Sequence, residues 1–207
     1  VQPKVNRVVM ALDPPTREFN NPRHIGATVM WQVKPMYEYL VGIDHKTGKL
    51  VPQLATEWAL ENGGTAIRYK LRQGVQFQGG YGEFTAKDVV HSWKDLIRDD
   101  SEGGYQVALI KKFVDTVEPV ASHEVLVKMK AINADVFNVI SEEEAGFEIM
   151  SADHFAKVGK DPTMAEAPIV GTGPYAFKER QQAQFIRFAR NDFKHYRVTP
   201  DFPEFEF

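Results

Sequence analysis

The sequence predicts an α/β protein, because strand-like and helix-like patterns alternate along it. Apolar and basic side chains alternate over residues 67–72, the pattern of a half-buried strand. Residues 85–99 predict a helix with one apolar face, formed by Val89, Val90, Trp93, Leu96 and Ile97. Residues 113–120 and 124–130 predict a β-hairpin. Strands and helices of this length and order are typical of a mixed α/β fold.

The first elements are a strand and a helix. Residues 5–12 are mostly apolar and predict a buried strand, which ends at Asp13-Pro14-Pro15. Apolar residues then recur at helical spacing over residues 25–40. Pro35 lies inside this run, and proline lacks the N–H that a helix interior needs, so we expect a kink or a break there.

The stretch GIDHKTGKL superficially resembles a phosphate-binding loop. Five residues separate Gly42 from Gly48 where that loop has four, and Leu50 stands where it needs a hydroxyl. We therefore expect a β-turn in which Gly48 supplies the positive φ. Further along, Thr85 and Asp88 have the spacing of a capping box. Short helices are predicted over residues 134–142 and 152–158.

The last third of the chain begins with a loop rich in proline and glycine, KDPTMAEAPIVGTGPY, which predicts a domain boundary. Strands are predicted near residues 175–178 and 184–190. Residues 205–207 alternate like a strand and have no polar tail after them, so we expect the chain to be a fragment of a longer protein.

Composition excludes several classes of site. The 207 residues are 43% hydrophobic, which is enough for a globular core, and the formal charge of −3 argues against a nucleic-acid partner. The chain has no Cys, which excludes disulfides, thiolate metal sites and a cysteine nucleophile. No apolar run reaches about 18 residues, so no membrane-spanning helix is predicted. An export signal was removed or was never present, since the first ten residues lack its pattern.

Catalytic and cofactor motifs are not found. Gly171-Thr172-Gly173 is followed by Pro174, whereas a dinucleotide loop continues into a helix. The six histidines are scattered, and no pair has the i, i+4 spacing of a helical metal site. Residues 142–144 are three consecutive glutamates, which indicate a solvated face rather than a calcium loop. We therefore predict no enzyme activity, no cofactor and no metal.

Five phrases carry a family resemblance: PMYEYL, TGKLVPQLATEW, YKLRQGVQF, FTAKDVVHSW and PIVGTGPYAF, in that order. They resemble the extracellular solute-binding proteins of family 5, which are the oligopeptide, dipeptide and nickel-chelate receptors of ABC importers. The resemblance covers nearly the whole chain, from about Val8 to Phe207. It implies that GIDHKTGKL is part of a hairpin turn.

The resemblance also implies an architecture. We expect a periplasmic-binding-protein fold of type II (cluster C), with a partial first lobe formed by residues 1–45 and 166–207. Residues 46–165 would form an inserted α+β subdomain. The third lobe, which closes over the ligand, would be missing from this chain.

By the same resemblance, the function would be capture of a peptide or related small solute outside the cytoplasmic membrane and delivery to an ABC permease. The protein would be periplasmic or extracellular and lipid-anchored, and monomeric at full length. The alternative is a ligand-sensing module of a regulatory or signalling protein built on the same fold. Gene neighbourhood separates the two, since permease and ATPase genes favour transport.

Three ligand-binding residues follow from the resemblance: Ile25, Met30 and Tyr105. We expect them along one concave surface, each partly exposed. The alternative for Met30 is a core position on its helix, and for Tyr105 a surface aromatic packed on the next segment. Residues 171–174 are interpreted as structural, shaping the crossing between lobe and subdomain.

Overall fold

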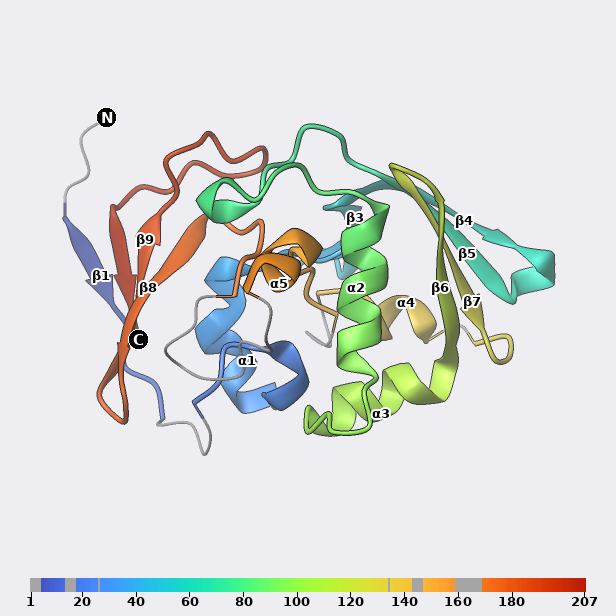
Figure 1. The fold of residues 1–207 in the computed structure, drawn as a ribbon, viewed down its shortest axis with the longest axis horizontal. Helices are drawn as coiled ribbons and strands as arrows, with labels where there is room; N and C mark the ends of the chain where they lie inside the picture. Colours follow the sequence, from blue (N-terminus) through green and yellow to red (C-terminus); the bar gives the residue numbers. More distant parts are fainter. Residues whose placement is uncertain (1–4, 14–17, 26, 134, 143–146, 159–168) are drawn as a thin grey trace.

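The computed structural model describes residues 5–13, 18–25, 27–133, 135–142, 147–158 and 169–207. Two four-stranded sheets lie at opposite ends of the long axis, with the main helices between and beside them (Figure 1). Each sheet faces its own cluster of buried apolar side chains. The mixed α/β fold predicted from the sequence is confirmed.

The first sheet joins the two ends of the chain. Its strand order is β1-β10-β9-β8. These strands span Arg7–Val9, Glu204–Glu206, Phe185–Arg190 and Tyr175–Gln181. β1 pairs parallel with β10, with Val8 opposite Phe205, whereas the other two pairings are antiparallel. Residues from the beginning and the end of the chain therefore share one sheet, on the left of Figure 1.

The strand predicted over residues 5–12 is shorter and more exposed than expected. β1 covers three residues, and Val9 is 63% exposed. The prediction of a buried strand is wrong because β1 is the edge of its sheet and pairs with β10 alone. An apolar run does not by itself tell an edge strand from a central one.

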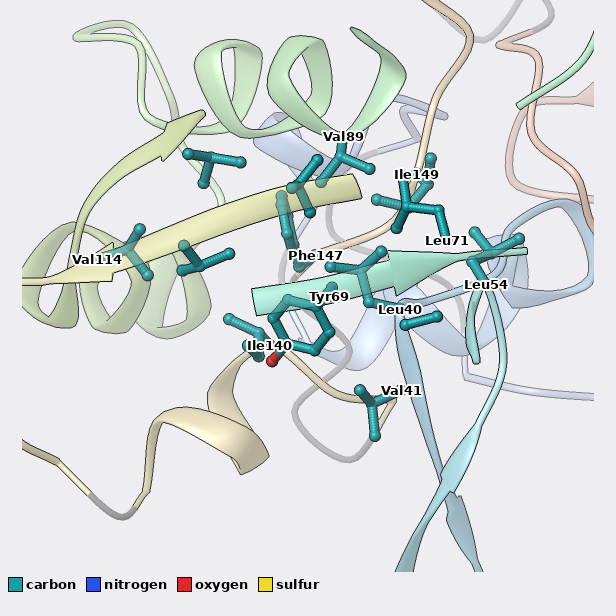
Figure 2. Close-up of a cluster of buried hydrophobic side chains, with 14 of the residues drawn as sticks. Leu40, Val41, Leu54, Tyr69, Leu71, Val89, Val114, Ile140, Phe147 and Ile149 are labelled. Carbon is teal, nitrogen blue, oxygen red and sulfur yellow. The ribbon is translucent and has the colours of Figure 1, made fainter. Parts of the chain in front are cut away.

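The second sheet is an antiparallel unit with order β4-β5-β7-β6. Its strands span Ala55–Glu61, Ala66–Leu71, Glu124–Met129 and Val114–Ala121. Val125, Val127 and Met129 are buried on one face of β7, as their spacing predicted. Tyr69 and Leu71 of β5 point into the same core, in which Val89 of the neighbouring helix also lies (Figure 2).

Two helices cover this core. α2 (Ala86–Leu96) packs on β6 and β7, and α3 (Gly104–Phe113) leads directly into β6. The capping box predicted at the start of α2 is present, with Asp88 Oδ2 accepting the backbone N–H of Thr85 at 2.9 Å. The other Asp88 oxygen accepts the N–H of Ala152 at 2.9 Å, which ties α2 to α5 (Ala152–Val158). Trp93, expected to be largely buried, is only partly so.

The predicted break at Pro35 is confirmed. α1 covers Ala27–Val33, a short 3-10 turn follows at Lys34–Met36, and the backbone is extended at Tyr37. The turn expected at Gly48 joins β2 (Val41–Asp44) to β3 (Lys49–Pro52), with Gly48 at a φ of 67°. α4 covers Val136–Val139, inside the predicted 134–142.

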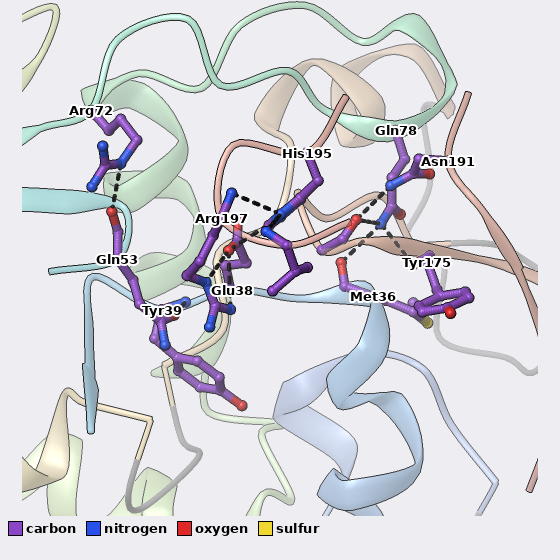
Figure 3. Close-up of polar contacts among 12 residues, drawn as sticks. Met36, Glu38, Tyr39, Gln53, Arg72, Gln78, Tyr175, Asn191, His195 and Arg197 are labelled. Carbon is purple, nitrogen blue, oxygen red and sulfur yellow. Dashed lines mark hydrogen bonds and ion pairs between the residues drawn. The ribbon is translucent and has the colours of Figure 1, made fainter. Parts of the chain in front are cut away.

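We call the first sheet with its core the first body, and the second sheet with its core the second body. The segment 171–175 crosses between these two bodies at very close range. A Cβ on Gly171 would lie 2.2 Å from the carbonyl oxygen of Met36, and one on Gly173 would lie 2.4 Å from that of Pro35. The side-chain amide of Gln78 donates to the carbonyl oxygens of Met36, Gly173 and Tyr175 at 2.9–3.0 Å (Figure 3). Only glycine allows this approach.

The division into a lobe (1–45 and 166–207) and a subdomain (46–165) stays a prediction. Two details bear on its boundaries. The β2–β3 hairpin spans residue 45, and Leu40, Val41 and Val170 pack in the core of the second sheet. The boundary at 165/166 lies outside the described residues.

Candidate functional site

A cavity of about 200 Å³ lies where β1 and β10 end, beside the C-terminus marked in Figure 1. It is lined by Leu12, Asp13, Glu18, Gln32, Phe207 and residues 180, 181 and 183–186. Parallel strands expose their carboxyl ends at the same edge of a sheet, and open α/β sheets bind ligands there. This cavity is therefore the candidate site.

A β-bulge in β8 directs Arg180 into this cavity. Phe177 pairs with Phe188, but the next pairs are Glu179 with Arg187 and Arg180 with Ile186, so the register shifts after Phe177. Strict alternation from Phe177 would place Arg180 on the outer face. The shift puts it on the inner face, opposite the buried Ile186.

Arg180 is almost completely buried, and its side chain is only 3% exposed. Its Nη2 donates to Asn20 Oδ1 at 2.7 Å, and its Nη1 lies 4.0 Å from Glu18 Oε2. Burial lowers the pKa of the Arg180 guanidinium, and Glu18 opposes that shift. Arginine nevertheless stays protonated in proteins, so the group is a cation.

The partners of Arg180 are held by bonds to other elements. The Tyr37 hydroxyl donates to the carbonyl oxygen of Asn20 at 2.7 Å, and Glu18 Oε1 accepts the backbone N–H of Ala183 at 2.6 Å. The segment from Glu18 to Asn20 is thereby fixed across the turn between β8 and β9.

The next residues anchor the site to the second body. Asn21 Nδ2 donates to Asp95 Oδ2 at 3.1 Å, and the buried Arg23 lies 3.4 Å from Asp95 and 3.0 Å from Asp100. Its carbonyl oxygen accepts the backbone N–H of Glu102 at 2.7 Å. These ionic and backbone contacts hold residues 21–23 against the end of α2.

A second cavity, of about 330 Å³, lies on the other side of α1 and is mainly aromatic. Trp31, Tyr39, Tyr175, Phe202 and Phe205 are among its lining residues. Lys34 lies over the Trp31 ring at 4.9 Å and pairs with Glu142 at 2.8 Å. This cavity offers apolar surface and a neutralised ion pair.

A buried polar cluster closes the junction next to it. Glu38 is fully buried, 3.3 Å from His195 Nε2 and 3.2 Å from Arg197 Nη2 (Figure 3). The Tyr39 hydroxyl donates to Glu148 at 2.9 Å, and burial raises the pKa of Glu148 to about 8. Of these groups, Tyr39 and Arg197 also line the second cavity.

The three residues named from the sequence have different positions. Ile25 and Met30 are 0% and 2% exposed and belong to the core of the first sheet, so the expectation that they are partly exposed is wrong. They lie on the inward face of α1 and of the turn before it, which is the core position weighed for Met30. Tyr105 is 65% exposed at the start of α3, as expected. The ligand role of all three stays a prediction.

The polar residues of the cavity were not predicted. Arg180 follows Lys178 and Glu179, and such a charge run reads as a solvated turn. Arg180 is turned inward by the bulge after Phe177, and no pattern in the sequence marks that bulge. Asn20 lies 160 positions away and meets Arg180 only through the tertiary fold.

The described residues contain no group of three or more His, Asp or Glu side chains arranged to hold a metal ion. Within the same residues, no helix is long and apolar enough to cross a membrane. The residues of the candidate site supply one buried cation, two acidic side chains, amide groups and apolar walls, which suit noncovalent binding.

Comparison with known proteins agrees with this view. The family model of bacterial extracellular solute-binding proteins, family 5 (middle), matches residues 49–207. A probable di/tripeptide-binding protein 5 of Pseudomonas aeruginosa is 29% identical over 188 residues, which cover 78% of this chain and 35% of that protein. The peptide transport periplasmic protein SapA of Salmonella typhimurium is 28% identical, over 82% of this chain and 33% of its own.

Among solved structures, the oligopeptide-binding protein AppA of Bacillus subtilis, in complex with a nonapeptide, superposes with a TM-score of 0.81. The match covers 99% of this chain and 40% of that one, at 24% identity, and it confirms the type II periplasmic-binding-protein fold. The chain spans about a third of the length of the curated relatives it matches. It belongs to family 5 of the bacterial extracellular solute-binding proteins.

Proposed function

We propose that this chain forms the first part of a receptor that binds a peptide or related small solute outside the cytoplasmic membrane and delivers it to an ABC permease. The observation that carries the proposal is the family match over residues 49–207. The names of the relatives support it, since they are peptide-binding and peptide-transport proteins.

The geometry supports binding at the carboxyl ends of β1 and β10. The cavity there has an apolar wall, from Leu12, Ile186 and Phe207, and a buried cation, Arg180. Ligand sites are commonly mostly apolar with a few polar groups that fix orientation. Its volume of about 200 Å³ fits one end of a solute, and a second lobe would cover the rest.

The mechanism we infer is hinge closure. A solute that touches two lobes binds the closed state more tightly than the open one, so it shifts the population toward closure. The candidate cavity lies on the sheet edge that a second lobe would face. Tyr105 would add an aromatic surface at the start of α3.

Isothermal titration calorimetry on the natural full-length protein tests the proposal. A panel of dipeptides to pentapeptides is titrated at constant ionic strength, and each bound peptide is recovered and analysed by mass spectrometry. We expect saturable binding and recovery of intact peptide. Hydrolysed peptide, or no binding by any panel member, would contradict the proposed function.

The sensing alternative uses the same binding step with a different partner. The titration does not separate the two roles, but uptake does. Deletion of the gene should abolish uptake of the bound peptide into cells if the protein serves an importer, and should leave uptake unchanged if it only reports the ligand.

A further inference from the structure

Three nitrogen donors beside the first cavity are buried without an acceptor among the described residues. They are Nε and Nη1 of Arg180 and Nδ2 of Asn20. A buried donor left without an acceptor destabilises a folded protein. All three are N–H groups, so only a hydrogen-bond acceptor, such as an oxygen atom, can satisfy them.

The cation in this group has a long ion pair with Glu18. Glu18 Oε2 lies 4.0 Å from Arg180 Nη1, too far for a hydrogen bond, while Glu18 Oε1 is held by the N–H of Ala183 at 2.6 Å. Nη2 of Arg180 already donates to Asn20. The remaining N–H groups of the guanidinium have no acceptor among the described residues, and because they are buried, an anion reaches them only when the Glu18 side chain moves aside.

On the basis of the proposed function, we propose that Arg180 and Asn20 form an anion subsite that takes a carboxylate of the bound solute. Glu18 is the competing carboxylate, and its side chain moves away from Nη1 when the solute carboxylate arrives. The solutes selected are therefore acids with one free carboxylate at the end that enters the cavity.

The surrounding charge favours a carboxylate over a dianion. Two acidic side chains, Asp13 and Glu18, also line the cavity. Like charges repel strongly at a site with little water, so a doubly charged phosphate meets more repulsion than a singly charged carboxylate. The walls formed by Leu12 and Ile186 accept an apolar side chain next to that carboxylate.

The position of the cavity explains how one arginine can act on a long solute. The bulge after Phe177 places Arg180 beside the cavity, between the Glu18–Asn20 segment and the β8–β9 turn. A solute would enter with its carboxylate first and extend its remaining length along the sheet edge toward the solvent.

The test compares acids with their amides on the natural full-length protein. A peptide found in the panel is titrated as the free acid, as the C-terminal amide, and as the amide of an analogue with one Asp side chain. The first two peptides measure how much a terminal carboxylate contributes to the binding affinity. The third peptide shows whether a side-chain carboxylate can replace it.

We expect the free acid to bind about 10- to 100-fold more tightly than the amide, the range for a charge-assisted hydrogen-bonded pair. In Arg180→Gln this ratio should fall close to one. In Glu18→Gln the acid should bind several-fold more tightly than in the wild type, because a competing carboxylate is removed. The ratio within each variant does not depend on its stability, so a modest loss of folding free energy leaves the readout intact.

Arg187→Gln is the matched control. It removes the same charge from the neighbouring strand, where Arg187 pairs with Glu206 on the outer face, and the acid-to-amide ratio should not change. Equal affinities for acid and amide in the wild type would overturn the anion subsite and leave the proposed function standing. A ratio that persists in Arg180→Gln would also overturn it. No binding by any peptide would overturn both proposals together.

Discussion

The two sheets of this protein differ in how far apart their strands lie in the sequence. All four strands of the second sheet come from residues 55–129, and adjacent strands in it pair antiparallel. The first sheet joins residues 7–9 to residues 175–206 and contains a parallel pair. A parallel pair leaves two carboxyl ends at one edge, and the candidate site lies there.

The cores packed against the two sheets also differ. The second core is large, and the side chains labelled in Figure 2 are completely or almost completely buried. The first sheet has an exposed edge strand, and Arg180 and Asn20 near it have buried donors without an acceptor among the described residues. In the second core, the Tyr69 hydroxyl and the Trp93 ring nitrogen are also without a partner there, but neither group is charged. We propose that the second body provides rigid support and that the first carries the binding chemistry. The following predictions test this contrast.

The largest expected effect is in the second core. Ile67 is fully buried on β5, the strand between β4 and β7, so Ile67→Ala should lower the free energy of unfolding by about 2–5 kcal/mol. Leu60, on β4, is 56% exposed, and Leu60→Ala should change it by only about 0.5 kcal/mol. Urea unfolding measures both. Similar losses in the two variants would mean that this core is not tightly packed.

The second prediction concerns pH and the junction between the bodies. The pKa of Glu148 is raised to about 8 from an ordinary 4.5, so the folded protein holds a proton that the unfolded chain releases between these values. Because the folded state then binds more protons, the free energy of unfolding should fall as pH rises from 4.5 to 8.

The Glu148→Gln variant keeps the shape of this side chain but cannot titrate. Its free energy of unfolding should fall less over the same pH interval, by on the order of 4 kcal/mol, since each pKa unit corresponds to about 1.4 kcal/mol. Urea unfolding at several pH values gives both slopes. Parallel slopes for variant and wild type would show that Glu148 is ionised in the folded protein at neutral pH.

The third prediction concerns the crossing segment. Gly171→Ala would bring a methyl group 2.2 Å from the Met36 carbonyl oxygen, and the resulting strain should cost about 1–3 kcal/mol. Gly74→Ala meets no atom within 4 Å and carries only the strain of a φ of 77°, about 1 kcal/mol. Thermal unfolding ranks them. A milder effect at Gly171 would show that the two bodies separate easily there.

The smallest expected effect on stability is at Tyr105, whose ring is 65% exposed. Tyr105→Ala should leave the melting temperature of the protein without peptide nearly unchanged. If the ring stacks on ligand, the same change should weaken peptide binding by roughly 1–3 kcal/mol. Calorimetry and thermal unfolding on the same samples decide it. Unchanged affinity, or a clear loss of stability, would make Tyr105 a packing residue.

Sequence reasoning succeeded where burial repeats locally. The alternation over residues 67–72 and over 124–129 gave β5 and β7, and the Thr85–Asp88 spacing gave the start of α2. It missed α3, in which the polar Gln106 is buried beside Val107 and Ile110 and interrupts the apolar stripe. Sequence reasoning also did not identify β1 as an edge strand, because the exposure of a strand depends on whether it has a neighbour on both sides.

The site could not be predicted for a related reason. The inward position of Arg180 depends on one bulge, and its neighbour Asn20 comes from the other end of the chain. The family resemblance led to α1 and α3, and of those residues Ile25 and Met30 are in the core. Sequence patterns identify elements well, but the convergence of distant polar groups is a property of the tertiary fold.

Hydrogen–deuterium exchange on the natural full-length protein, with and without a bound peptide, tests the central claim most directly. The account predicts that peptide binding slows amide exchange in residues 18–20 and 180–186, which lie at the first cavity. Exchange in β6 and β7 should remain the same. Protection confined to the second sheet, with residues 180–186 unaffected, would contradict the claim that the first sheet carries the binding site.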